Sequence, residues 1–219
     1  MTTPPPGSPW PDDLVRVFLS HSALYKRFVG DVAEHLRGFG AHGFVAHETM
    51  TITLPWQAQI EHALTTAEAL VALVHPEVND SPWCQQEIGW AYGRGIPVLC
   101  VRIGADPKGF PGSLQWPSGY DLDPGKVASA IGGWLNKQPS LSNRVASGLI
   151  KALEEAGSYY EARDAARALD AVGTLTTEQW DAVDHIVRTN DQVGQSIWAR
   201  EALGPLFARA GRDMPKYTG

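Results

Sequence analysis

The residues best suited to chemistry lie in the stretch SPWCQQEIGWAYGRG, residues 81–95. Glu87 stands there between Trp83 and Trp90, and a spacing of three or four residues places these side chains and Arg94 on one helix face. An ionised carboxylate is costly to remove from water without a partner. Glu87 therefore pairs with Arg94, is solvated at the edge of the face, or is kept for chemistry.

The sequence around Glu87 predicts where its helix begins and ends. Ser81 is a good N-cap and Pro82 suits the first helical position. Gly93 and Gly95 are expected to end the helix before the next strand. Ile88 and Ala91 are expected to form the neighbouring, core-packing face.

Four short apolar runs predict the elements that position this helix. They are VRVFLS (15–20), GFVA (43–46), ALVALV (69–74) and PVLCVRI (97–103), with centres roughly 28 residues apart. Amphipathic helical sequence separates them, which is typical of repeated βα units. We therefore predict a flavodoxin-like, three-layer α/β fold with a parallel sheet of four to five strands.

Ligands of such folds bind beyond the carboxyl ends of the strands. The loops expected there are 20–25, 46–55, 75–81 and 103–112.

The chain is expected to have three parts. Residues 1–13 hold five prolines and predict a disordered leader, and residues 14–137 form the α/β domain. Residues 138–219 predict a small region of three or four helices, with a capping box at Thr176 and Gln179 and no cluster of chemistry-bearing residues.

Composition excludes several classes of function. The chain is 43% apolar and 19% charged with a net charge of −6, and it has no run of Lys and Arg, so nucleic-acid binding is not expected. No apolar run is long enough to span a membrane, and no secretory signal is visible, so a cytoplasmic location is expected. Cys84 and Cys100 lack the spacing of a metal site or a disulfide framework and are interpreted as core residues; no metal site is predicted.

Four segments together resemble a bacterial TIR (Toll/interleukin-1 receptor) domain. They are FLSHSALYK (18–26), FVAHE (44–48), LPWQAQIEHAL (54–64) and SPWCQQEIGWAYGRGIPVLCVRIG (81–104), and the resemblance extends over about residues 15–137. Its most specific element is Trp83 followed four positions later by Glu87. Catalytic members cleave NAD⁺ between nicotinamide and ribose, so the resemblance implies that NAD⁺ is a substrate, that no cofactor is needed and that Glu87 is catalytic.

The resemblance also implies further roles. Bacterial members act in anti-phage immunity by depleting NAD⁺ or by making cyclic or modified ADP-ribose signals. In the family, the loop after the second strand closes over substrate and mediates self-assembly, so the resemblance implies a homo-oligomer and an effector or sensor partner. The implied substrate-binding residues are Phe18, Ser20, His21, Lys26, Ala46, His47, Trp56 and Trp83.

This sequence departs from the family pattern at two places. Leu24 and Tyr25 stand where an acidic residue is common, and the segment TMTIT (49–53) lacks the usual proline. These departures affect the expected substrate contacts and loop closure, but not Glu87.

The chemistry implied for Glu87 agrees with the residues present. Nicotinamide attached to ribose is already a cationic leaving group, so one carboxylate that stabilises the ribosyl cation can suffice. Two other interpretations remain open: a non-enzymatic TIR module that assembles with other TIR domains, and a related nucleoside-processing enzyme such as a deoxyribosyl transferase.

Overall fold

The structure is a computed structural model that describes residues 8–10, 14–46, 56–118 and 121–219. The chain divides into two compact units. The first comprises Met1–Leu36 and His42–Ile131, and the second comprises Arg37–Ala41 and Gly132–Gly219.

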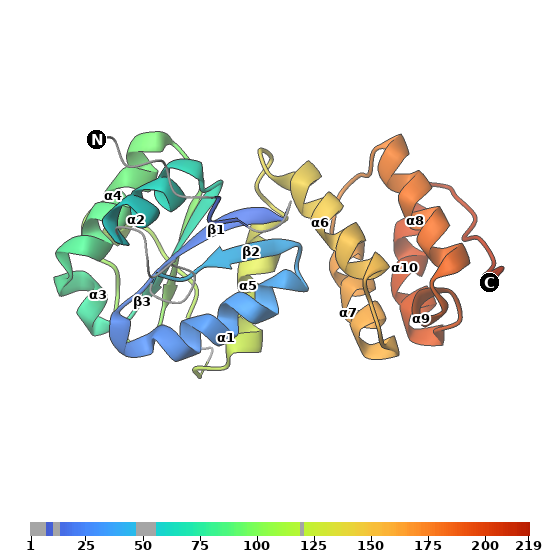
Figure 1. Cartoon of the computed structure of the whole chain (residues 1–219), viewed down its shortest axis with the longest axis horizontal. Helices are drawn as coiled ribbons and strands as arrows, with labels where there is room; N and C mark the ends of the chain where they lie inside the picture. The colour runs from blue at the N-terminus through green and yellow to red at the C-terminus, as the bar shows by residue number, and fades with distance from the viewer. Residues whose placement is uncertain (1–7, 11–13, 47–55, 119–120) are drawn as a thin grey trace. The chain divides into compact units, whose positions relative to one another are not determined.

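The first unit is built on a four-stranded sheet of order β2-β1-β3-β4 (Figure 1). β3 runs parallel to both neighbours, with Val17 opposite Ala69 and Ala72 opposite Cys100. The strands are β1 (Val15–Ser20), β2 (Ala41–Phe44), β3 (Ala69–Val74) and β4 (Val98–Arg102). The predicted α/β fold class is confirmed, with four strands in the described residues.

Helices lie on both faces of this sheet. Figure 1 shows α2 and α4 on one face and α1 on the other, and α5 begins beside α1, where Gly125 approaches His35. The helical segments of this unit are η1 (Ala23–Tyr25), α1 (Lys26–Arg37), α2 (Trp56–Thr66), α3 (Pro76–Asp80), α4 (Pro82–Arg94), η2 (Phe110–Ser113) and α5 (Pro124–Leu135), the last of which continues into the second unit.

The alternation of side chains along β1 decides which of them face α4. Successive residues of a strand point to opposite faces, so Phe18 and Ser20 share one face. Phe18 packs in a core cluster with Ile60 of α2 and Ile88 of α4. Ser20 therefore points toward the same two helices.

The helix that carries Glu87 begins and ends as its sequence predicts, within a residue. The Ser81 side chain accepts a hydrogen bond from the Cys84 backbone N–H, and Pro82 is the first helical residue. Gly95 ends the helix in the left-handed conformation, with φ of 67°, which glycine adopts without steric cost.

Three parts of the first unit differ from the expectation. The second strand is Ala41–Phe44, two residues before the expected 43–46. Segment 75–81, expected as a loop, contains the short helix α3, which starts at Pro76. Trp10, which lies in the predicted leader, is buried in the core cluster, and its indole N–H donates to Thr66 Oγ1 at 2.8 Å. Of the predicted leader, residues 8–10 are described, and residues 1–7 and 11–13 lie outside the described ranges.

The second unit is helical. Its described residues 138–219 hold five helices rather than the three or four expected, because α9 is a single short turn between α8 and α10. Its core is formed by apolar residues of α6, α7, α8 and α10, including Leu149, Leu169, Val183 and Leu203. The predicted capping box at Thr176 and Gln179 is present, with both reciprocal hydrogen bonds. The helices are α6 (Ser142–Glu154), α7 (Tyr159–Asp170), α8 (Thr177–Thr189), α9 (Asp191–Gly194) and α10 (Ile197–Arg209).

Candidate active site

Glu87 is held by a serine that is distant in sequence. Ser20, the last residue of β1, donates a hydrogen bond of 2.6 Å from its Oγ to Oε2 of Glu87. Both side chains are buried, with 1% and 7% of their residue surfaces exposed. A buried carboxylate with a short hydrogen bond has a defined position and orientation, as a catalytic group requires.

Burial changes the acidity of Glu87. Loss of water raises the pKa of Glu87 from 4.5 to about 7, because the charged form is poorly solvated, and the Ser20 hydrogen bond acts in the opposite direction. The carboxyl group therefore titrates near neutral pH. Perturbed acidity of this kind is common in functional sites, although buried structural groups show it too.

The structure excludes two of the ordinary roles considered for Glu87. Arg94 does not pair with it, since its Nη1 donates to the carbonyls of Leu64 and Ala67 at 2.5 and 2.9 Å. Solvation at the edge of the face is excluded by burial. The buried face of α4 comprises Cys84, Glu87, Ile88 and Ala91, so the expected separation between the Glu87 face and the core face is wrong.

A cavity of about 640 Å³ lies in front of Glu87. Trp56 of α2 and Trp83 of α4 form part of its wall, with ring centroids 5.0 Å apart in an edge-to-face arrangement. Both indoles are about half exposed, at 46% and 47%. The cavity therefore combines a buried carboxylate with accessible aromatic surface, which suits a ligand with a flat ring.

Most described residues predicted to bind substrate meet at this cavity. His21, Ala46, Trp56, Trp83 and Glu87 line it. The Nδ1 of His21 lies 2.8 Å from the Leu19 carbonyl oxygen, which places a hydrogen on that nitrogen.

The other predicted residues are placed differently. Phe18 is buried in the core and stacks on Phe44 at 5.3 Å, and Lys26 is an exposed residue at the start of α1. Neither is among the described residues that line the cavity. Ser20 reaches the site through Glu87, and His47 lies outside the described residues.

Sequence reasoning missed several residues of the cavity wall. Cys84, interpreted as a core residue, is buried but lines the cavity, and its Sγ lies 3.4 Å from the His21 carbonyl oxygen. Its position three residues before Glu87, on the same helix face, was the available signal. The other residues not predicted to line the cavity are Leu19, Ser22, Ala23, Ile60 and Ser81.

A buried histidine supports the loop that follows β1. His75 stacks on Tyr25 with ring centroids 3.3 Å apart and meets the edge of Phe28. Burial lowers the pKa of His75 to about 4, so its ring is neutral at pH 7. His75 therefore acts as a packing residue and adds no positive charge near the site.

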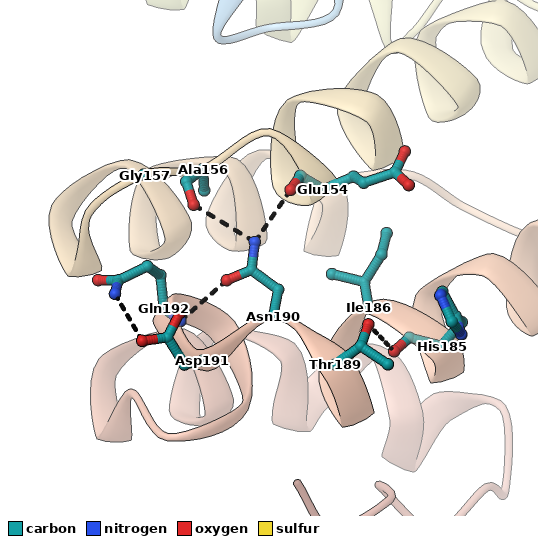
Figure 2. A pocket seen from close by; sticks show the side chains of 9 residues that line it. All are labelled: Glu154, Ala156, Gly157, His185, Ile186, Thr189, Asn190, Asp191 and Gln192. Atoms are coloured by element: carbon teal, nitrogen blue, oxygen red, sulfur yellow. Dashed lines mark hydrogen bonds between the residues drawn. The ribbon is translucent and has the colours of Figure 1, made fainter. Parts of the chain in front are cut away.

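A second cavity, of about 360 Å³, lies in the helical unit (Figure 2). The Asn190 amide points to the end of α6 and donates to the carbonyls of Glu154 and Ala156 at 2.9 and 3.3 Å. Gln192 donates to Asp191 at 3.0 Å. These polar groups bond one another, as expected of a structural junction.

Two further classes of site are absent from the described part of the chain. No group of three or more His, Cys, Asp or Glu residues there could hold a metal ion. Among the helices of the described ranges, none is both long and apolar enough to cross a membrane.

Comparison with known proteins identifies the first unit. Residues 17–125 match the family model of the TIR domain. This segment is a TIR domain. The matched residues include every described residue of the cavity wall and both partners of the Ser20–Glu87 hydrogen bond.

Two other comparisons accompany this result. The chain is similar to the crystal structure of the TIR domain of the Toll-related receptor TRR-2 from the lower metazoan Hydra magnipapillata. The identity is 13%, the TM-score is 0.44, and the match covers 53% of this chain and 94% of the Hydra chain. No curated protein matches the chain.

Proposed function

We propose that the TIR domain is an NAD⁺ nucleosidase that cleaves the bond between nicotinamide and ribose, with Glu87 as the catalytic residue. One observation carries the proposal. A buried carboxylate, oriented by a 2.6 Å hydrogen bond, lines a cavity walled by two half-exposed tryptophans within a TIR domain.

The proposed reaction needs a negative charge beside the ribose, and it does not need a general acid. When the bond from the ribosyl carbon to the pyridinium nitrogen breaks, the electron pair goes to nitrogen and nicotinamide leaves as a neutral molecule. Positive charge develops on the ribose, where an ionised Glu87 would stabilise it through space or as a transient nucleophile. Water or a hydroxyl group of the substrate then captures the ribosyl carbon and loses a proton, giving ADP-ribose or a cyclic isomer.

The size and wall of the cavity support this substrate class. A volume of about 640 Å³ lies within the range of small-molecule sites. The indoles of Trp56 and Trp83 offer faces and edges on which a pyridinium or adenine ring can stack. Among the described residues of the wall, Glu87 is the only carboxylate, so it is the group available to a developing positive charge.

The proposal extends to the setting expected from the family. It places the enzyme in the cytoplasm of a bacterium, in anti-phage immunity, as a homo-oligomer formed through TIR surfaces and controlled by an effector or sensor protein. TIR domains serve as signalling adaptors as well as enzymes, so this setting applies to a domain that cleaves NAD⁺.

The test is to incubate purified protein with NAD⁺, with and without a crowding agent, and to identify products by chromatography with mass detection. The proposal predicts free nicotinamide together with ADP-ribose or a cyclic or modified form, whose mass names the reaction. Cleavage of deoxynucleosides in preference to NAD⁺ would support a deoxyribosyl transferase instead. No turnover of either substrate, including after addition of a TIR partner, would support a non-enzymatic module.

A further inference from the structure

We propose that Ser20 is a positioning residue for Glu87, and that its hydroxyl holds the carboxylate in its ionised, oriented form rather than contacting the substrate. Family resemblance alone predicts a different role for Ser20, a direct contact with the nucleotide. The kinetic part of this inference rests on the proposed NAD⁺ cleavage, whereas the part that concerns Glu87 itself does not.

The single hydrogen of the Ser20 hydroxyl is committed to Glu87. A serine hydroxyl has one hydrogen, and that hydrogen is directed at Oε2 of Glu87 over 2.6 Å. Only 1% of the residue is exposed, and Ser20 is not among the described residues of the cavity wall. Oε1 of Glu87 takes no part in this hydrogen bond.

The electrostatic effect has a definite sign. A hydrogen bond donated to a carboxylate stabilises its charged form and lowers its pKa, against the opposing effect of burial. The free energy of a hydrogen bond to a charged group is equivalent to a change of about one to two in the pKa of that group. Without Ser20, Glu87 would remain protonated to higher pH and would lose its fixed orientation.

Other groups around Glu87 do not duplicate this hydrogen bond. His21, after β1, and Cys84, on α4, are the other titratable residues in the described cavity wall, while α2 contributes Trp56 and Ile60. Cys100 of β4 lies in the core behind α4, where burial raises its pKa to about 12. The pKa of Cys84 is also raised, mainly by burial, so both thiols stay neutral at pH 7.

The experiment follows the carboxyl carbon of Glu87 by NMR in protein labelled with ¹³C at the glutamate side chains. The resonance is assigned by its absence in Glu87→Gln. Ser20→Ala removes the hydroxyl, and Ser20→Thr restores it. Ser22→Ala is the matched control, because Ser22 lines the same cavity but accepts its hydrogen bond from the Leu24 N–H.

The titration midpoint of Glu87 should rise by about one to two pH units in Ser20→Ala and stay within a few tenths of wild type in Ser22→Ala. In Ser20→Thr it should return toward the wild-type value. A folded Ser20→Ala whose midpoint equals that of wild type would overturn the inference. If Ser20→Ala does not fold, Ser20→Cys takes its place, because a thiol is a weak hydrogen-bond donor. A raised midpoint in Ser20→Cys supports the inference, and a midpoint equal to wild type contradicts it.

Kinetics separate a positioning role from substrate contact. If Ser20 acts through Glu87, Ser20→Ala should lower kcat about tenfold at pH 7, regain most of it at pH 9 and leave KM unchanged. A raised KM at every pH, with no recovery, would instead assign Ser20 to substrate binding. A shifted midpoint with no nicotinamide release from any variant would refute the proposed function while supporting the role of Ser20.

Discussion

At the scale of single residues, Glu87 occupies a place where a neutral side chain would be more stable. It is 7% exposed and has one hydrogen-bond donor in Ser20. The raised pKa of Glu87 reflects the cost of burying a charge, because burial favours the protonated form in the folded protein. Such a conflict between stability and ionisation is expected at a site that uses the charge.

The first prediction concerns the pH dependence of activity. Since the ionised carboxylate is the proposed active form and burial raises the pKa of Glu87 to about 7, kcat/KM for NAD⁺ should rise between pH 5.5 and 8.5. The midpoint should lie within about one unit of pH 7. Initial rates of nicotinamide release in constant-ionic-strength buffers provide the measurement, and a rate that falls over this range would contradict an ionised Glu87.

The second prediction is that Glu87→Gln stabilises the folded protein at high pH. The pKa of Glu87 in the folded protein lies above its ordinary value of 4.5. Protonated Glu87 therefore contributes fully to the free energy of unfolding below pH 4.5, and this contribution is lost as pH rises through 7. The loss is on the order of 3 kcal/mol. Glutamine stays neutral and its carbonyl oxygen can still accept the Ser20 hydrogen bond.

Denaturant unfolding of wild type and Glu87→Gln at pH 8.5, 6.5 and 4.5 tests this. The variant should be more stable by about 3 kcal/mol at pH 8.5, and the difference should approach zero at pH 4.5. Titration of His75, whose low pKa destabilises the fold in acid, is common to both proteins and cancels. A variant less stable than wild type at pH 8.5 would be the opposite result.

At the scale of elements, capping and junction residues hold the helices in place. In the helical unit, Asn190 ends α8, caps α9 through the Gln192 N–H at 2.8 Å, and donates to two carbonyls at the end of α6 (Figure 2). The side chain thus bonds backbone groups at α6 and α9, and the Asn190 backbone N–H donates to the Ile186 carbonyl of α8. The polar groups around the second cavity are explained by this structural role.

The third prediction follows from that junction. Asn190→Ala should lower the free energy of unfolding of the helical unit by about 2 kcal/mol, because it removes a cap and leaves two carbonyl acceptors without their donor. Asn190→Asp keeps the cap acceptor but lacks the amide donor, so it should not restore stability fully. Denaturation followed by circular dichroism measures both variants, and a change below about 0.5 kcal/mol for Asn190→Ala would show that the junction contributes little.

At the scale of the whole molecule, the helical unit includes a segment distant in sequence. Arg37–Ala41 belongs to it, and Gly40, with φ of 72°, lies against the backbone of Gly148 in α6. A truncation after Lys137 would therefore remove packing partners of Gly40. Point substitutions within the helical unit are the cleaner way to perturb it.

The fourth prediction concerns this close approach. A Cβ added at Gly148 would lie 2.5 Å from the Gly40 carbonyl oxygen, so Gly148→Ala should destabilise the helical unit by about 1–3 kcal/mol. Gly133→Ala is the matched control, because Gly133 is also helical but has open space around its Cβ position. The control should be neutral or stabilising by up to about 1 kcal/mol. Equal thermal midpoints for the two variants would contradict the predicted clash.

The sequence predicts the framework better than the contacts within it. Regular spacing of apolar runs predicts the four strands of the described residues, the second of them displaced by two residues. Ser81 and Gly95 predict the ends of α4, because these signals are local. The bond from Ser20 to Glu87 joins residues 67 positions apart and depends on how α4 packs on the sheet. The same reason explains why Cys84 was not predicted to line the cavity and why the packing of Gly40 on Gly148 was not foreseen.

The central claim, that Glu87 is the catalytic carboxylate of NAD⁺ cleavage, is tested most directly by nicotinamide release from two matched variants. Glu61→Gln is the control, since Glu61 is an exposed carboxylate of α2 outside the described cavity wall. Both variants must first show wild-type circular dichroism. We predict that Glu87→Gln loses at least about a hundredfold in kcat, while Glu61→Gln stays within about twofold of wild type. A folded Glu87→Gln that releases nicotinamide as fast as Glu61→Gln would contradict the claim.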